Sequence, residues 1–167
     1  MELTIRDKWI SLRESGKVKD MDGNDVLNVQ GKFWTMTKKK FIKTLDGETK
    51  YIVRNKFWTL FRYKAYVLTP EKEVVAFLTN KFFSLHDRYL IDTKVGKLEI
   101  VGNILGFDYH IILNDKEIGH VARKISLRDS FVLTLDDDQD MYFYVALVVA
   151  IANIGKQKAE DTAAAFN

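Results

Sequence analysis

Lysine residues gather densely at one point of this 167-residue chain, where Lys38, Lys39 and Lys40 are consecutive and Lys43 follows. Clustered ammonium groups bind anions, and each one near an anionic membrane contributes about 1 kcal/mol of attraction. Three adjacent side chains at a loop or strand end cannot all be buried, so we expect at least two to face water. This cluster is the first candidate lipid- or anion-binding site, together with three lysines expected at the same end of the molecule: Lys32, Lys56 and Lys64.

A cluster of carboxylates, from Asp136 to Asp140, precedes the apolar segment 141–154, and Asp136, Asp137 and Asp138 are its candidate metal ligands. Carboxylates at the start of a helix cap its free N–H groups and interact favourably with its dipole. Clustered carboxylates also bind calcium, but no glycine or terminal glutamate completes an EF-hand spacing here. Helix capping is the favoured interpretation and a calcium site the alternative; no other metal site is expected.

The histidines are His86, His110 and His120. His110 and His120 fall on opposite arms of one predicted hairpin, where they could lie close together. A metal site needs further ligands, and no acidic residue at a clear spacing accompanies them. A structural role is therefore the favoured interpretation.

Catalytic motifs are missing from the sequence. It contains no G-x-S-x-G, no H-E-x-x-H, no phosphate-binding loop and no G-x-G-x-x-G. The absence of cysteine excludes a thiol nucleophile, a disulfide and a cysteine-based zinc site. These observations predict a protein that is not an enzyme and uses no cofactor.

The charge balance indicates a soluble surface with no strong preference for nucleic acid. The chain has 26 basic and 23 acidic residues, for a net charge of +3. So small an excess does not by itself predict nucleic-acid binding, so no nucleic-acid partner is expected. The opening residues Met1 to Trp9 already carry four charges and lack the apolar core of a signal peptide. We expect a cytoplasmic protein, peripheral at the membrane if its basic residues bind lipid.

A short phrase recurs along the chain and reads cation, any residue, apolar, Ser or Thr, apolar. Its first four copies begin at Lys8, Lys32, Lys56 and Lys81, at intervals of 24, 24 and 25 residues, and a fifth begins at Arg123. A fixed period of this length indicates one structural unit used repeatedly.

The unit between copies is predicted to be a β-hairpin. Alternating apolar stretches flank a turn in each unit, and the first two turns contain Asp22-Gly23 and Asp46-Gly47. Asp-Gly between such stretches is typical of hairpins because glycine accepts the positive φ that these turns require. The units together form a meander of about 12 antiparallel strands. In a meander every phrase lies at one end, which is rich in cations, and every hairpin turn at the other, which is rich in carboxylates.

The segment 141–154 has neither turn residues nor a polar stripe. A helix that is apolar all round must be enclosed, and this one is shorter than the roughly 20 residues of a membrane span. A barrel of about 12 strands is too wide for its own side chains to fill. We therefore predict a mainly β fold, a closed barrel around a buried C-terminal helix; two stacked sheets and a short membrane anchor are the alternatives.

The chain resembles the LURP-one-related (YxjI-type) family from about Ile5 to Gly155. The resemblance rests on the order of several segments rather than on any one of them. These are Lys8 to Arg13 with Val18-Lys19-Asp20, then Asp22-Gly23, Val29 to Phe33, Lys81 to Leu85 with Tyr89 to Asp92, Leu98 to Gly102, and Leu147 to Ile151.

That family is similar to the tubby C-terminal domain and to phospholipid scramblases, and its bacterial members are largely uncharacterised. The resemblance implies a closed 12-stranded barrel around a hydrophobic helix and no established enzymatic activity. The phosphoinositide-binding motif of tubby has no match here, so no residue is carried over. Asn153 stands where the family is expected to have Asp.

These observations predict one barrel domain over residues 1–155, with its helix at 140–155, and a polar, alanine-rich tail over 156–167. We expect the part of this tail from Ala159 to Asn167 to be frayed helix. The favoured function is a non-enzymatic module that binds anionic phospholipid headgroups, or a membrane surface, through its basic rim. A domain that binds a protein partner and a scramblase-like, membrane-associated protein are the alternatives. Oligomeric state cannot be derived from the sequence.

Overall fold

The computed structural model describes residues 1–6, 15–31, 39–56, 62–81, 88–103, 106–124 and 130–165. Within these ranges the chain forms twelve strands followed by one helix. The strands of the first half are β1 (Glu2–Arg6), β2 (Gly16–Lys19), β3 (Asp25–Gly31), β4 (Lys39–Lys43), β5 (Thr49–Lys56) and β6 (Arg62–Leu68). The second half contains β7 (Val74–Lys81), β8 (Arg88–Thr93), β9 (Gly96–Asn103), β10 (Asp108–Leu113), β11 (Lys116–Arg123), β12 (Ser130–Leu135) and helix α2 (Met141–Ala165).

The strands form a closed antiparallel barrel in which neighbours in sequence are neighbours in space and β1 pairs with β12. This arrangement confirms the predicted meander and its closure. Two seams are thin: β1 and β2 share the single registered pair Thr4–Lys19, and β7 and β8 share two. The wall therefore consists of two well-paired stretches, β2–β7 and β8–β12 with β1.

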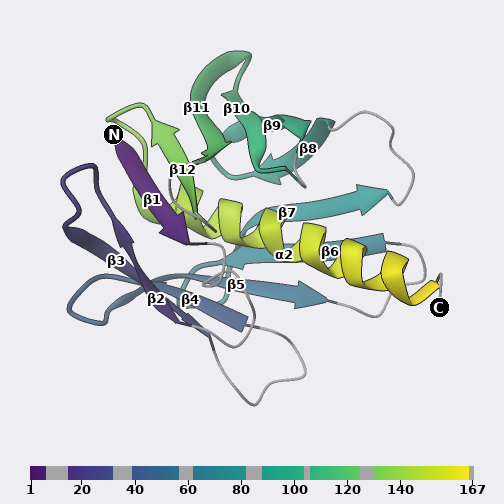
Figure 1. Ribbon diagram of the computed structural model, residues 1–167, viewed down its shortest axis with the longest axis horizontal. Coiled ribbons are helices and arrows are strands. Elements are labelled where there is room, and N and C mark those ends of the chain that lie inside the picture. The colour runs from purple at the N-terminus through teal and green to yellow at the C-terminus, as the bar shows by residue number, and fades with distance from the viewer. Residues whose placement is uncertain are drawn as a thin grey trace.

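Because the chain is a meander, the turns that follow β2, β4, β6, β8 and β10 lie at one end of the barrel, which we call the turn end. Helix α2 begins at this end and runs to the opposite one, where the chain's C-terminus lies (Figure 1). The described first residues of three repeated phrases, Lys56, Lys81 and Arg123, lie at the strand ends away from these turns. The copies that begin at Lys8 and Lys32 lie outside the described residues, and the other copies lie partly outside them.

Helix α2 is enclosed over its apolar half, as predicted. Its residues from Phe143 to Ile154 are each at most 8% exposed. Asn153 is buried among them, and neither atom of its amide group has a hydrogen-bond partner. None of the helices that the structure describes is long and apolar enough to cross a membrane.

The helix does not end near Gly155 but continues to Ala165. A glycine within a helix costs only about 1 kcal/mol relative to alanine. The residues that follow are mostly lysine, alanine, glutamine and glutamate, which favour helix, so they extend it into the segment expected to be a tail.

Candidate functional site

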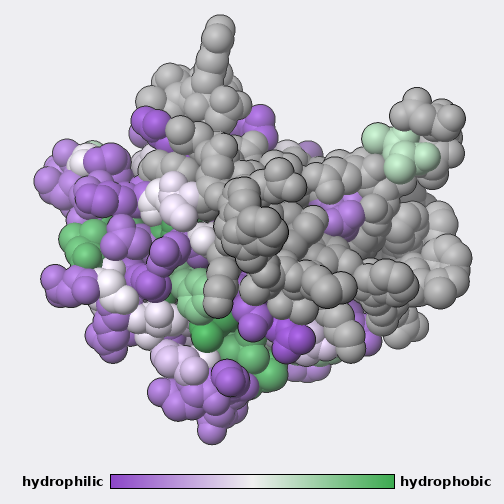
Figure 2. All heavy atoms as spheres, turned by 90° about the horizontal axis from the view of Figure 1, so that it is seen from below, coloured by the Kyte–Doolittle hydropathy of each residue, from purple (hydrophilic) through white to green (hydrophobic). Residues whose placement is uncertain are grey.

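An open groove crosses the outer face of β4, β5 and β6 and reaches the turn between β6 and β7; we call it the outer groove. Its volume is about 540 Å³, which falls in the range of small-molecule sites. Figure 2 shows apolar surface, in green, beside hydrophilic side chains, in purple, on the face of the molecule seen from below. Three cations and five apolar or aromatic side chains line the groove: Lys39, Arg54 and Lys72, with Phe41, Ile52, Tyr66, Leu68 and Val74.

Strand alternation places these side chains together on the outside of the barrel. In β4 the side chains of Lys40 and Ile42 are buried, which leaves Lys39 and Phe41 on the outer face. In β5 the buried positions are Val53 and Asn55, so Arg54 faces outward. The groove is therefore a property of three adjacent strands and not of one loop.

Two of the groove cations lie directly opposite each other. Lys39 and Arg54 are cross-strand partners in the β4–β5 pair, and neither has an ion pair with a described residue. Opposed side chains in such a pair have Cβ atoms about 5 Å apart, and like charges there are destabilising. An anion bound between the two would relieve that repulsion.

The third cation, Lys72, occupies a backbone position that the repeat gives to glycine. The turns at 20–24, 44–48 and 69–73 share one hydrogen-bonding pattern, in which the fourth N–H donates to the first carbonyl and the first N–H to the fifth carbonyl. The fourth residue is Gly23 (φ 83°), Gly47 (φ 92°) and then Lys72 (φ 72°). A left-handed conformation is unfavourable for a residue with a Cβ atom. The turn therefore holds Lys72 in a strained backbone conformation.

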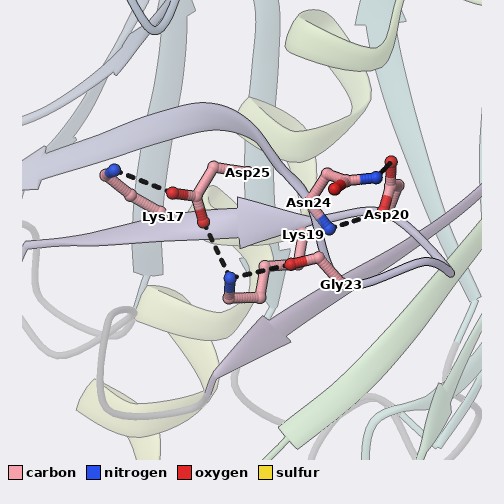
Figure 3. Close-up of polar contacts among 6 residues, drawn as sticks. All are labelled: Lys17, Lys19, Asp20, Gly23, Asn24 and Asp25. Carbon is pink, nitrogen blue, oxygen red and sulfur yellow. Dashed lines mark hydrogen bonds and ion pairs between the residues drawn. The ribbon is translucent and has the colours of Figure 1, made fainter.

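Side chains complete the three turns in the same way. In the first turn the Asp20 carboxylate accepts a hydrogen bond of 2.8 Å from the N–H of Asn24, as Figure 3 shows. Thr44 and Thr69 accept the equivalent bonds in the other two turns. The carboxylate of Asp25, beside the first turn, accepts hydrogen bonds from the ammonium groups of Lys17 and Lys19 (Figure 3). These bonds lower the Asp25 pKa, and the bond from Lys17 has the larger effect.

Aromatic side chains continue the apolar surface of the groove across the strands. Tyr66 packs on Phe77 with ring centroids 4.9 Å apart. The ammonium group of Lys43 lies 5.9 Å from the centroid of the Phe41 ring. The outer faces of β4 to β7 therefore present flat apolar surface next to positive charge.

The lysines of the predicted cluster lie in different environments in the structure. Lys39 lines the outer groove, while Lys43 and Lys64 are half-buried on the outside of β4 and β6. Lys40 is fully buried, so its assignment to an exposed basic surface is wrong. The reason is that β4 already begins at Lys39, and its alternation turns the next side chain inward. Lys32, Lys38 and the side chain of Lys56 lie outside the described residues.

Arg54 and Lys72 belong to the site but were not predicted from the sequence. Arg54 carries the signal of strand alternation, since it lies two residues from Ile52 on the same face. Lys72 carries a signal within the repeat, since it aligns with the glycines of the two preceding turns. Neither residue belongs to a run of like charges, whereas such a run was the basis for predicting a site at residues 38–43.

The aspartates before α2 have different partners and do not form one site. Asp140, the last residue of the predicted cluster, caps the helix as expected: its Oδ1 accepts hydrogen bonds from the N–H groups of Tyr142 (2.9 Å) and Phe143 (3.3 Å). Asp136 pairs with Lys116 at 2.8 Å, and Asp137 pairs with the amino group of Met1, which lowers the Asp137 pKa. No group of three metal-ligating side chains occurs among the described residues.

His110 and His120 are direct partners in the β10–β11 pair, and their rings stack with centroids 4.6 Å apart. Each ring also contacts a carboxylate that the sequence analysis did not assign to it. His110 lies 2.9 Å from Glu117 and His120 lies 3.1 Å from Asp108. These contacts tie two strands together on the outer face of the barrel.

A family model described as LURP-one-related matches residues 1–152. The chain belongs to the LURP-one-related family. This result confirms the resemblance drawn from the sequence, and the family and fold together indicate a binding module. Comparison with curated proteins gives no significant match.

Among solved structures, the chain is similar to the X-ray structure of a protein from Arabidopsis thaliana. The TM-score is 0.64 with 15% sequence identity, over 92% of this chain and 90% of the other. At this identity the similarity establishes a shared fold and nothing about function. The binding properties of this LURP-one-related protein depend on its own surface.

Proposed function

We propose that this protein is a non-enzymatic binding module whose outer groove takes an anionic amphiphile, with an anionic phospholipid as the favoured ligand. The observation that carries the proposal is the opposed pair Lys39 and Arg54, which has no carboxylate partner among the described residues. A phosphate or carboxylate between the two cations would accept hydrogen bonds from both.

The apolar lining supports a ligand with a hydrophobic part. Phe41, Ile52 and Leu68 lie on the same surface as the cations, so a bound headgroup would leave its glycerol and first acyl carbons against them. A site for free inorganic anions gains nothing from such a surface. Lys72 would reach the ligand from the turn, which gives its unfavourable φ of 72° a function.

The test is co-sedimentation with phosphatidylcholine vesicles that contain or lack phosphatidylserine or a phosphoinositide. Wild type is expected to bind only the anionic vesicles, and more weakly at high salt because exposed charges are screened. The double variant Lys39→Glu, Arg54→Glu should lose at least about tenfold in affinity. Inorganic phosphate is the competitor that separates an isolated anion site from a lipid site, and it should compete poorly.

The control is Lys124→Glu, which makes the charge change of one groove substitution at an exposed position on the link between β11 and β12. It should bind as wild type does. If it loses as much affinity as a single groove variant, attraction is spread over the whole basic surface and the groove is not the site. Absence of binding to every vesicle would also overturn the proposal.

A further inference from the structure

The turn end of the barrel carries apolar side chains that are exposed to solvent and do not belong to the core. Met21 is 74% exposed, Val95 57% and Leu45 49%, and each lies in a hairpin turn. Large apolar side chains are exposed in few places in the described part of the chain, so their concentration in turns is a specific feature. Figure 2 shows green side chains among purple ones at its left end, which is the end where α2 begins in Figure 1.

The exposed residues recur at fixed positions of the repeated turn. The second and third residues of the turns at 20–24, 44–48 and 69–73 are an apolar residue and an acid. The pairs are Met21-Asp22, Leu45-Asp46 and Pro70-Glu71. The positive φ falls on the fourth residue of this turn, and the second residue is a position that suits proline, as in the third turn. Turn formation therefore does not explain methionine and leucine at the second position.

The start of α2 adds a half-exposed apolar floor between these turns. Met141 and Tyr142 are partly buried at the mouth of the barrel and pack against its core. The sequence has four methionines, and Met21 and Met141 both lie at this end. Methionine is flexible and polarisable, and it is common on surfaces that accept varied apolar partners.

The exposed carboxylates at the turn end indicate the charge of the partner. Many of its carboxylates are neutralised within the molecule: Asp25 by Lys17 and Lys19, and Asp136 by Lys116. Asp22, Asp46 and Glu71, beside the apolar residues, are exposed and have no ion pair with a described residue. They would repel anionic lipid and attract cationic side chains.

The spacing of the turns fits a helix. Successive hairpins are two strands apart, so their turns are separated by about 10 Å. Seven residues of an α-helix rise about 10.5 Å. An amphipathic helix with apolar residues at this interval would meet Met21 and Leu45 with the same face, and its flanking cations would reach Asp22 and Asp46.

From this geometry we propose that the turn end docks a basic amphipathic helix of a protein partner. The turns that carry Met21 and Leu45 contribute no side chain to the outer groove, so the proposal does not depend on lipid binding. Binding is tested with a fluorescent synthetic amphipathic peptide of leucine and lysine, and with a second peptide in which glutamate replaces lysine. Wild type should bind the lysine peptide and not the glutamate peptide.

The double variant Met21→Ser, Leu45→Ser should weaken lysine-peptide binding about tenfold or more. Asp22→Asn with Asp46→Asn should weaken it at low salt and flatten its salt dependence. Leu90→Ser is the control, since Leu90 is 61% exposed on the strand β8 and away from the turns. Neither it nor the groove variant Arg54→Glu should change peptide binding.

Equal binding of both peptides, or unchanged binding by the double variant, would overturn the proposal. Vesicle binding that is lost in the Met21→Ser, Leu45→Ser variant and kept in Arg54→Glu would also overturn it, because the turn end would then be a membrane contact. All these positions are exposed, so unchanged melting temperatures will show that the variants are folded.

Discussion

The outer face of β4–β6 and the outer face of β8–β11 differ in whether their charged side chains are paired within the protein. On β8–β11, Glu99 is buried beneath Arg88 and Lys97, and both histidines contact carboxylates. On β4–β6, Lys39 and Arg54 oppose each other without a carboxylate among the described residues. One face is satisfied within the protein, whereas the other carries two opposed cations that an anionic ligand would stabilise.

The inner faces of the same two regions differ as well. The wall beside β5–β7 turns small side chains inward, among them Val53, Ala65 and Ala76. The wall of β9–β12 turns in larger ones, among them Tyr109, Phe131 and Leu133. Helix α2 makes most of its close backbone contacts with β5 and β6. The helix is therefore displaced toward the side with small side chains, behind the outer groove.

This difference shows how one repeat serves two purposes. The large side chains of β9–β12 fill the distance to the helix, and the internal ion pairs on their outer face add connections between strands. On the other side, the helix supports β5 and β6 directly, so their outer face is free to carry unpaired charge and a strained turn. The internally paired surface and the proposed binding surface therefore lie on different halves of the barrel.

The largest effect is expected from Val148→Asp, since Val148 is fully buried in the helix that both halves share. An unpaired carboxylate there should cost more than about 4 kcal/mol and abolish the fold. Thermal unfolding followed by circular dichroism measures the effect. Thr134→Asp, on the exposed face of β12, is the control and should change the melting temperature little. A soluble Val148→Asp protein with the melting temperature of wild type would contradict the enclosed helix.

Ala65→Leu tests the displacement of the helix. Ala65 is fully buried on β6, where the helix backbone is close, so the added atoms have no space. Overpacking of this kind costs about 1–3 kcal/mol, which denaturant titration resolves. Ala164→Leu, on the exposed end of α2, should be neutral. Unchanged stability of Ala65→Leu would mean that the helix is central and the two walls are equivalent.

Much of this fold could be predicted because its signals are local. The Asp-Gly turns fix the hairpins, and the unbroken apolar run of 141–154 requires enclosure. The end of the helix could not be predicted, since Gly155 and the lysines after it resemble a helix terminus although the helix continues. The size difference between the walls depends on which strands face the helix, and that is a property of the closed barrel alone.

The site was predicted less completely because charge density along the sequence is a poor guide to charge density on a barrel. Lys39 and Lys40 are adjacent in sequence, but strand alternation sends one outward and the other inward. Lys39 and Arg54 are 15 residues apart in sequence and directly opposite each other in the sheet. Cross-strand register creates the groove, and a single sequence does not specify it.

Glu99→Gln tests the satisfied face. Hydrogen bonds from Arg88, and then from Lys97, hold the Glu99 pKa below its usual 4.5. A lowered pKa means that the carboxylate stabilises the fold above about pH 4.5 and that this contribution is lost as the pH falls through the folded-state pKa. The variant should therefore be less stable than wild type at pH 7, and the difference should shrink in acid. Glu2→Gln, at an exposed position outside these contacts, is the control. A difference that stays constant down to pH 3 would assign the effect to packing.

Lys72→Gly tests the unsatisfied face and has the smallest expected effect on stability. Glycine accepts the φ of 72° without a steric cost, although it also increases the entropy of the unfolded chain. The net change should be a gain of no more than about 1 kcal/mol, measured by denaturant titration. The same variant should bind anionic vesicles more weakly, because the groove loses one of its three cations. Gly47→Lys is the reciprocal control: it places the same residue at the same turn position away from the groove, so it should lose stability without a gain in lipid binding. If Lys72→Gly loses stability, or if it binds as wild type does, the strained conformation at this turn is not maintained for the ligand.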